Sequence, residues 1–340
     1  DFAAMGARVV NYPARDLIFR DISGVSHEYE HSRIGALSRI IDSDYDVAVC
    51  GVDALVSMTM PPDILLANRF TLSSGDTLEP KAVASRLAEA GYTRCDTVEG
   101  AGQFALRGGI LDVFSPDMSH PLRIEFWGDE IDSICTFDVI SQRRDELIDT
   151  VTLPPAAEVL CGTPDEFSTR LYRLAEKFGA KNAVYTALLA AADSAKNGVM
   201  PTCPDRFMPL LYPQATLLDY TADCLIMLSE SARIKERLRT LGLQIDEQVA
   251  DLIKDNKLSK DFCTFYLPYD KLTATLAELD TVWLLRELSR SIATQASSGR
   301  IHDIGVVGVD DTDIGSYVVD FVVWLDRIHG IDDHQRQSAR

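Results

Sequence analysis

Hydrophobic and polar positions alternate most regularly along residues 104–142, and this pattern predicts two or three β-strands joined by short turns. Residues 122–127 read LRIEFW, so three apolar side chains alternate with Arg123, Glu125 and Trp127. Because successive side chains of a strand point to opposite faces, one face is expected in a core and the other presents these three residues to solvent. An exposed Trp beside an Arg is typical of a protein–protein contact rather than of a catalytic pocket.

The segments on either side of this region alternate apolar runs with helical spacings. Strands are expected at residues 7–13, 46–55 and 223–230, a strand followed by a turn at 70–78, and helices at 31–42, 79–92, 164–197, 231–256 and 270–290. The continuous apolar run at 46–55 is typical of a buried parallel strand, which implies a right-handed strand–helix–strand crossover with the first strand. The chain is therefore predicted to be α/β.

Length and charge exclude several classes of function. A chain of 340 residues is expected to form two or three domains, and its net charge of −19 disfavours a phosphate-tracking surface. There is no apolar run of 18 residues and no signal peptide, so neither a membrane span nor secretion is expected. The seven cysteines lack metal or disulfide spacing, which favours reduced thiols in the cytoplasm. Because residue 1 is Asp and residues 5–13 resemble the interior of an α/β unit, we expect a piece of a longer protein.

Motifs for catalysis and metal binding are weak. The dipeptide Gly-Lys never occurs, so a phosphate loop of the GxxxxGK[ST] type is not expected and this chain is predicted not to be an enzyme. Residues 27–31, HEYEH, formally match the HExxH pattern of zinc proteases, which requires a continuous helix. The flanking sequence favours a solvated loop instead, so no metal site is predicted.

Arg107 precedes Gly108 and Gly109, and paired glycines within a strand indicate a bulge or the close approach of another backbone. A bulge would shift the side-chain parity, so that Arg107 could share a face with Arg123 of the neighbouring strand. The alternative is that each Arg pairs locally on the surface with a carboxylate such as Glu125. The residues alone leave both possibilities open.

Three segments together resemble the N-terminal module of the bacterial transcription-repair coupling factors, which is itself similar to the excision-repair protein UvrB. These segments are LRGGILDVF, PLRIEFWGDEIDSICTFDVISQR and LPPAAEV. The resemblance covers about residues 7–290 and is strongest between 68 and 160. Residues 294–340 match nothing recognisable in the family.

The resemblance implies a split, degenerate helicase-like α/β domain with a parallel sheet, into which a smaller α+β domain is inserted. The implied boundaries are 1–67 and 154–291 for the two parts of the UvrB-like domain, 68–153 for the insertion and 292–340 for an unassigned tail. In the family the insertion recruits UvrA. Carried over by motif, Arg107 and Arg123 would be charged contacts and Trp127, where the family commonly has Phe, the aromatic anchor; Glu125 lies on the same face.

The resemblance also implies what other segments of such a protein would supply. ATP and Mg would bind in motor domains, and RNA polymerase and most DNA contacts would be made outside this chain, so UvrA is the partner expected here. The competing hypotheses are a helicase or ATPase fragment of the UvrB type, which would bind nucleotide, and a purely structural module that clamps the motor of its parent protein.

Overall fold

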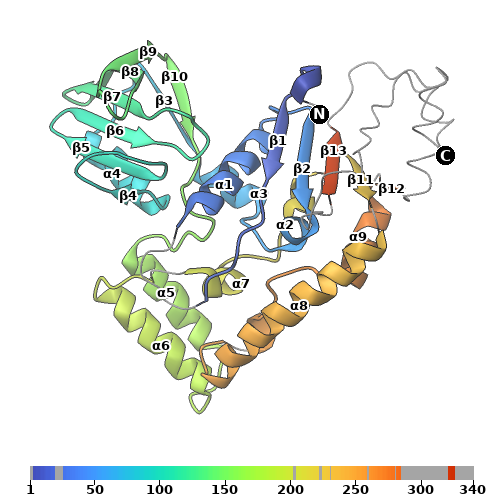
Figure 1. The fold of residues 1–340 in the computed structure, drawn as a ribbon. Coiled ribbons are helices and arrows are strands. Elements are labelled where there is room, and N and C mark those ends of the chain that lie inside the picture. The colour runs from blue at the N-terminus through green and yellow to red at the C-terminus, as the bar shows by residue number, and fades with distance from the viewer. Residues whose placement is uncertain are drawn as a thin grey trace, which may run out of the picture.

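The computed structural model describes residues 3–19, 26–201, 204–221, 224–229, 231–258, 260–279, 281–284 and 321–325. Within them the chain forms a central sheet, a smaller β-rich unit to one side of it, and a group of helices below (Figure 1). The coarse prediction of a mixed α/β protein is confirmed. Most of the predicted tail, 292–340, lies outside the described residues.

The central sheet has five strands in the order β1-β2-β13-β11-β12. They are β1 (Val9–Tyr12), β2 (Val47–Gly51), β13 (Phe321–Leu325), β11 (Leu225–Ser229) and β12 (Thr281–Leu284). β1 and β2 pair in parallel through the crossover helix α1 (Glu28–Ile41), as predicted. β13 runs antiparallel to both of its neighbours, and β11 and β12 are parallel.

Two element boundaries differ from the prediction. The apolar run 46–55 is not one strand, because β2 ends at Gly51 and a short helix α2 (Val52–Val56) follows at once. The segment 270–290 is not one helix, because α9 (Tyr269–Glu278) ends at Glu278 and β12 begins at Thr281. In both places a short apolar run in the sequence is compatible with helix or strand, and periodicity cannot separate the two.

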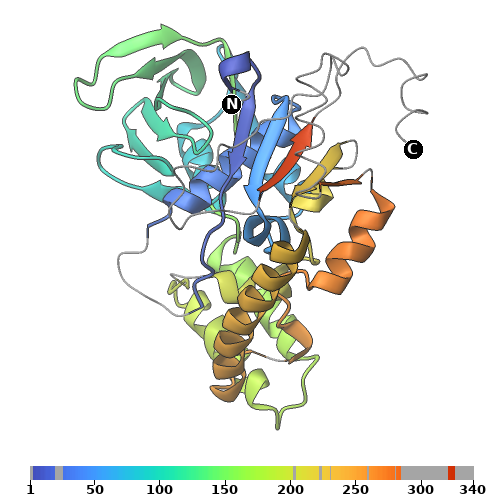
Figure 2. The ribbon, with the colours of Figure 1, turned by 45° about the vertical axis from the view of Figure 1, so that its right-hand side comes forward.

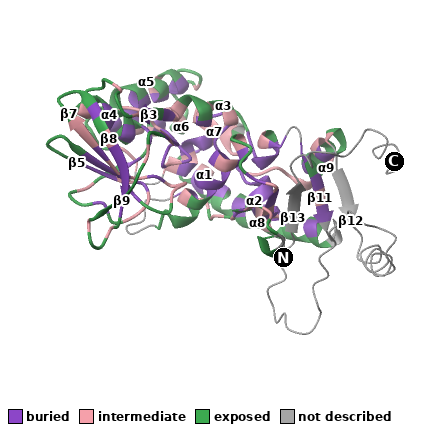
Figure 3. Cartoon of the chain, turned by 90° about the horizontal axis from the view of Figure 1, so that it is seen from above, coloured by how far each residue is buried: buried purple, intermediate pink, exposed green. Residues whose placement is uncertain are grey.

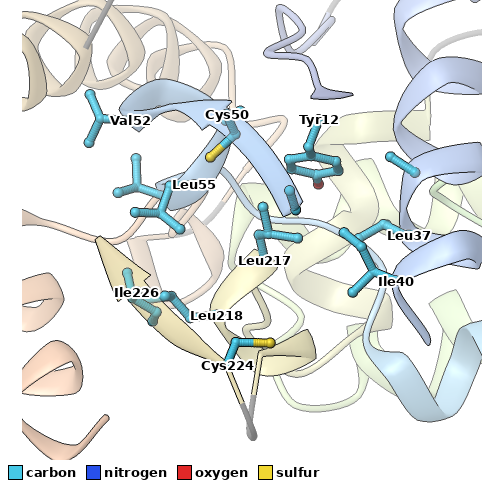
Figure 4. Close-up of a cluster of buried hydrophobic side chains, with 14 of the residues drawn as sticks. Tyr12, Leu37, Ile40, Cys50, Val52, Leu55, Leu217, Leu218, Cys224 and Ile226 are labelled. Atoms are coloured by element: carbon cyan, nitrogen blue, oxygen red, sulfur yellow. The ribbon is translucent and has the colours of Figure 1, made fainter. Parts of the chain in front are cut away.

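The core beside the central sheet is built from residues far apart in the sequence. Tyr12 of β1, Leu37 of α1 and Cys50 of β2 pack with Leu217 and with Ile226 of β11, and all five are buried (Figure 4). Leu217 begins a single helical turn, η3 (Leu217–Tyr220). Burial of these apolar side chains supplies the main driving force that joins the first and last thirds of the described chain.

The smaller unit contains a six-stranded sheet in the order β4-β5-β6-β7-β8-β9 and a separate pair, β3 with β10. The strands are β3 (Phe70–Ser73), β4 (Thr93–Arg94), β5 (Gln103–Arg107), β6 (Ile110–Phe114), β7 (Leu122–Trp127), β8 (Glu130–Phe137), β9 (Arg144–Leu147) and β10 (Thr150–Leu153). Four strands thus lie within residues 103–137, where two or three were predicted over 104–142. The turns are so short that each strand pairs antiparallel with the next.

Helix α4 (Pro80–Glu89) covers the inner face of this sheet. It begins at Pro80 and is followed by Gly91, as the sequence predicted. Val83 and Leu87 of α4 share a core with Leu111 of β6 and Ile124 of β7. In Figure 3 the buried residues gather along the strands of the small sheet and around α1. The other face of the sheet carries no described helix, and its side chains range from the buried Asp112 and Cys135 to the exposed Arg107 and Trp127.

The remaining helices are α3 (Pro62–Asn68), α5 (Pro164–Ala175), α6 (Ala183–Lys196), α7 (Met208–Leu211) and the long α8 (Ser231–Lys254), with short turns η1 (Ala3–Met5), η2 (Pro204–Phe207) and η4 (Lys260–Phe262). Of these, α5, α6, α7 and α8 lie in the lower half of the view in Figure 1. Thr163 and Glu166 cap α5 reciprocally. The rotated view in Figure 2 shows α8 crossing in front of the α5–α6 pair.

Candidate protein-interaction site

The side chains of β7 alternate between the two faces of the small sheet, as the sequence predicted. Leu122 and Ile124 are fully buried, whereas Arg123 and Glu125 are partly exposed. Trp127, at the end of the strand, is 83% exposed. Trp is among the side chains enriched at the hot spots of protein–protein interfaces.

The register of the sheet places further residues on the same outer face as Arg123 and Glu125. Asp112 of β6 lies directly opposite Arg123, and Ile110 lies opposite Glu125. On the other side of β7, Cys135 lies opposite Arg123. Residues directly opposite one another in neighbouring strands point to the same face, so this outer face is one continuous surface.

Gly108 and Gly109 form the two-residue turn of a hairpin rather than a bulge, which corrects one of the two interpretations of this pair. Arg107 pairs with Ile110 across the turn, and Gly108 has φ of +62°. The other interpretation, a close approach of backbone, is confirmed. A Cβ on Gly109 would lie 2.8 Å from the carbonyl oxygen of Phe126, and the Phe126 N–H donates to the Gly109 carbonyl oxygen at 2.7 Å.

Asp112 joins the two arginines of the predicted site. Its Oδ1 accepts from Arg123 Nε at 2.7 Å, and its Oδ2 accepts from Arg123 Nη2 at 2.9 Å. The same Oδ2 accepts from Arg107 Nη2 at 2.7 Å. Only 2% of the Asp112 side chain is exposed, against 51% of Arg107. Arg107 and Arg123 therefore do share a face, but without the bulge, and their common partner is Asp112 rather than Glu125.

Arg123 is more enclosed than the sequence predicted, with only 13% of its side chain exposed. Its guanidinium carbon lies 4.4 Å from the centre of the Phe137 ring, and it donates to the carbonyl and side-chain oxygens of Gln142 at 3.3 Å and 3.0 Å. The hydrogen bonds to Asp112 raise the pKa of Arg123 above its ordinary value. Arg123 is thus a fixed cation set into the surface.

Glu125 pairs with a residue that sequence reasoning did not single out. Arg144 of β9 makes an ion pair with it, and Ser133 donates to it at 3.4 Å. Arg144 lies opposite Phe137, which is on the face of Arg123. The outer face therefore carries the guanidinium groups of Arg107, Arg123 and Arg144, interleaved with the carboxylates of Asp112, Glu125 and, opposite Trp127, Glu130.

Large apolar side chains accompany these charges. Leu147 of β9 pairs with Cys135, which pairs with Arg123, so Leu147 belongs to the same outer face. Leu147 and Ile140 are both strongly exposed, as is Trp127. The face has the composition of a docking surface, in which aromatic and Arg side chains are enriched.

Asp112 and Arg144 were missed by sequence reasoning. One local signal pointed to Asp112: it is the only charge in the strand Ile110–Phe114, where a carboxylate is buried only if it is paired. Arg144 gave no comparable signal, since its relation to Glu125 depends on the register of β8 and β9.

The HExxH segment is helical rather than a loop, which corrects that expectation. Helix α1 begins at Glu28, so His31 lies within it and His27 directly precedes it. His27 Nδ1 bonds to Glu30 Oε2 at 2.7 Å, and Glu30 also accepts from the backbone of Glu158. Across the part of the chain that the structure describes, no group of three or more His, Cys, Asp or Glu is placed to hold a metal ion.

Comparison with known proteins shows what the segment that carries this surface is similar to. Residues 70–158 match the UvrB interaction domain. The matched segment contains α4 and all the strands from β3 to β10, and therefore the whole outer face.

Longer similarities extend to transcription-repair-coupling factors. The chain is 28% identical over 265 residues to that of Bacillus subtilis, which covers 74% of this chain and 22% of the relative. The factor of Staphylococcus haemolyticus is 27% identical over 266 residues, which cover 73% of this chain and 22% of the relative. The factor of Mycobacterium bovis is 37% identical over 174 residues, which cover 49% of this chain and 13% of the relative. The resemblance to this family is confirmed, and the chain spans less than a quarter of the length of these relatives.

None of the helices in the described ranges has the length and apolar character that crossing a bilayer requires.

The segment that matches the UvrB interaction domain presents its candidate surface on a sheet face that the described helices leave open.

Proposed function

We propose that the outer face of the β5–β9 sheet binds UvrA, and that this chain is the UvrA-recruiting module of a transcription-repair coupling protein. The observation that carries the proposal is the outer face itself: Arg107, Arg123 and Glu125 lie together on it, with Trp127 at its edge, within the segment that matches the UvrB interaction domain. The chain itself acts by binding, and no catalytic residue is proposed in it.

The physical basis is the pairing of an aromatic anchor with an arginine that is typical of interface hot spots. Trp127 offers a large apolar surface that becomes buried on contact, and Arg107 offers directional N–H donors to a partner carboxylate. The Glu125–Arg144 pair fixes the neighbouring part of the face. The half-exposed guanidinium of Arg107 favours an acidic group on the partner.

Calorimetric titration of UvrA with the wild-type chain, Trp127→Ala and Arg107→Ala tests the proposal. We expect each variant to lose about 2 kcal/mol or more of binding free energy, roughly a 30-fold loss of affinity. Leu243→Ala is the matched control, because Leu243 is a strongly exposed apolar side chain on α8, far along the chain from the sheet. Equal affinity of all four proteins would reject the assignment.

We further propose the organisation that goes with this role. Residues 1–67 and 154–291 would form the two parts of a degenerate helicase-like domain, and 68–153 the insertion. The core that joins β1, β2 and β11 across the insertion supports this division. ATP, Mg, RNA polymerase and the main DNA contacts would belong to other segments of a cytoplasmic protein. Limited proteolysis that releases a folded fragment close to 68–153 would support these boundaries.

A further inference from the structure

We infer that Asp112 is the positioning residue of this surface: it holds Arg107 and Arg123 in a fixed mutual geometry, and Arg107 is the arginine that contacts the partner. This inference rests on the proposed function. It assigns a role to a carboxylate that does not itself reach the partner.

The first step is the enclosure of Asp112. A carboxylate as buried as this one is tolerated only where charge-assisted hydrogen bonds replace water. Asp112 receives three of them from two guanidinium groups, at 2.7 Å, 2.9 Å and 2.7 Å. Three short bonds from two different strands fix the relative positions of Arg107 on β5 and Arg123 on β7.

The second step is the unequal use of donors by the two arginines. Arg123 uses Nε, Nη1 and Nη2 on Asp112 and Gln142, and it stacks on the Phe137 ring. Arg107 makes one hydrogen bond within the described chain, through Nη2. Its Nε and Nη1 are therefore left for a partner, and they belong to the half-exposed side chain. Arg123 frames the surface, and Arg107 presents donors.

The third step is the spacing of Arg107 and Trp127. Arg107 lies opposite Ile110, which lies opposite Glu125, two residues before Trp127. Two strand spacings across and two residues along the sheet separate the Cα atoms of Arg107 and Trp127, which is roughly 12 Å. The partner therefore meets the guanidinium and the indole as two separate contacts, an acidic group for one and an apolar pocket for the other. Asp112 matters because a mobile Arg107 side chain would lose this spacing and would pay an ordering entropy on binding.

A double-mutant cycle separates positioning from a merely structural role. Asp112→Asn keeps the shape of the side chain but removes its charge, and we expect UvrA affinity to fall about 10-fold. In the Arg107→Ala background the same substitution is expected to change affinity by less than about 2-fold, because the group through which it acts is already gone. In the Trp127→Ala background its full effect should remain. An equal effect of Asp112→Asn in all three backgrounds would overturn the inference.

Wild-type protein supplies a readout that needs no folded variant. NMR relaxation of the arginine Nε–Hε groups should show Arg107 as ordered as Arg123, and both more ordered than Arg94 of the short edge strand β4. An Arg107 side chain as mobile as Arg94 would overturn the inference.

For the affinity measurements, Asp46→Asn is the control for removing a carboxylate that pairs with an Arg elsewhere, and it should leave UvrA affinity unchanged.

The outcomes for the two proposals are distinct. Loss of UvrA binding in Trp127→Ala together with full binding in Asp112→Asn rejects the role of Asp112 and leaves the proposed function in place. Full binding in Trp127→Ala, Arg107→Ala and Asp112→Asn rejects the proposed function.

Discussion

Arg33 Nε donates to Glu158 Oε1 at 2.6 Å, and both side chains are completely buried. Arg33 lies on α1, whereas Glu158 follows β10, where the chain returns from the small sheet. Arg15 donates to the other oxygen of Glu158 at 2.8 Å and also makes two bonds to Asp205, at 2.9 Å each. This buried ion network fixes the base of the unit that carries the candidate surface.

We expect Glu158→Gln to be strongly destabilising. The substitution leaves Arg33 in the interior without its counter-ion, while Arg15 keeps Asp205, and breaking such a buried pair costs about 3–5 kcal/mol. Urea unfolding monitored by circular dichroism measures the loss. Asp46→Asn removes an exposed partner of Arg8 and serves as the control, with stability close to that of the wild type. A wild-type midpoint for Glu158→Gln would contradict the buried network.

His27 and Glu30 extend this network and make it sensitive to pH. Burial alone would raise the pKa of Glu30, but the hydrogen bond with His27 and the charge of Arg15 lower it to about 2. The hydrogen bond to Glu30 raises the pKa of His27 above its ordinary value of 6.5. Partial burial and the charge of Arg15 lower this pKa, and the charge of Asp205 raises it slightly. The protonated form of His27 is thus the one that the fold prefers.

Substitution of His27 should therefore remove a stabilisation that depends on pH. A raised pKa in the folded state gives stability that is fully present below pH 6.5 and is lost as pH rises through the folded pKa. We expect His27→Gln to be less stable than the wild type at pH 6 and to approach it at higher pH. Urea unfolding from about pH 6 to pH 9 measures the difference. A constant difference across this range would show that His27 is not charged in the fold.

His31 acts in the opposite direction. Burial lowers its pKa, so the stability that it contributes is present above pH 6.5 and is lost at lower pH. His31→Gln should therefore change the pH dependence on the acid side, whereas His27→Gln changes it on the basic side.

The contact between His31 and Gly102 predicts a second sensitive point, where α1 meets the small unit. A Cβ on Gly102 would lie 2.5 Å from His31 Nε2, and Gly102 has φ of +75°. Gly102→Ala should cost about 1–3 kcal/mol through strain and steric overlap. The double variant with His31→Ala should recover the steric part but not the backbone strain. Unfolding of the single and double variants checks this, and equal stability of Gly102→Ala and wild type would contradict the close contact.

The faces of β7 could be predicted from the sequence because the period of a strand is two and requires no knowledge of the fold. The pairing of Asp112 with Arg107 and Arg123 could not, because it depends on the registers of β5 with β6 and of β6 with β7. The sequence indicated that these glycines were special, but two physical explanations were compatible with them. Geometry alone decides between a turn and a bulge.

The buried network was invisible to sequence reasoning for a different reason. Arg15 is 143 residues from Glu158 and 190 from Asp205, and no local periodicity relates such positions. Sequence analysis singled out none of these residues, although Arg33 falls in the expected helix 31–42 and Glu158 in the segment LPPAAEV. The predicted start of α1, residue 31, was also wrong, since the helix begins at Glu28. The charged residues of its first turn resemble a solvated loop when their partners are unknown.

The exposed guanidinium of Arg107 predicts how binding to UvrA depends on salt. Arg107 is half exposed, so its interaction with an acidic partner is screened as ionic strength rises. We expect wild-type affinity to fall by several-fold between about 0.05 M and 0.5 M salt, mainly through slower association. Arg107→Ala should bind more weakly with a shallower dependence on salt, whereas Trp127→Ala should bind more weakly with the wild-type dependence, because its contribution is apolar. Association rates measured by surface plasmon resonance at several salt concentrations separate these effects. Parallel salt dependences for wild type and Arg107→Ala would mean that Arg107 lies outside the contact.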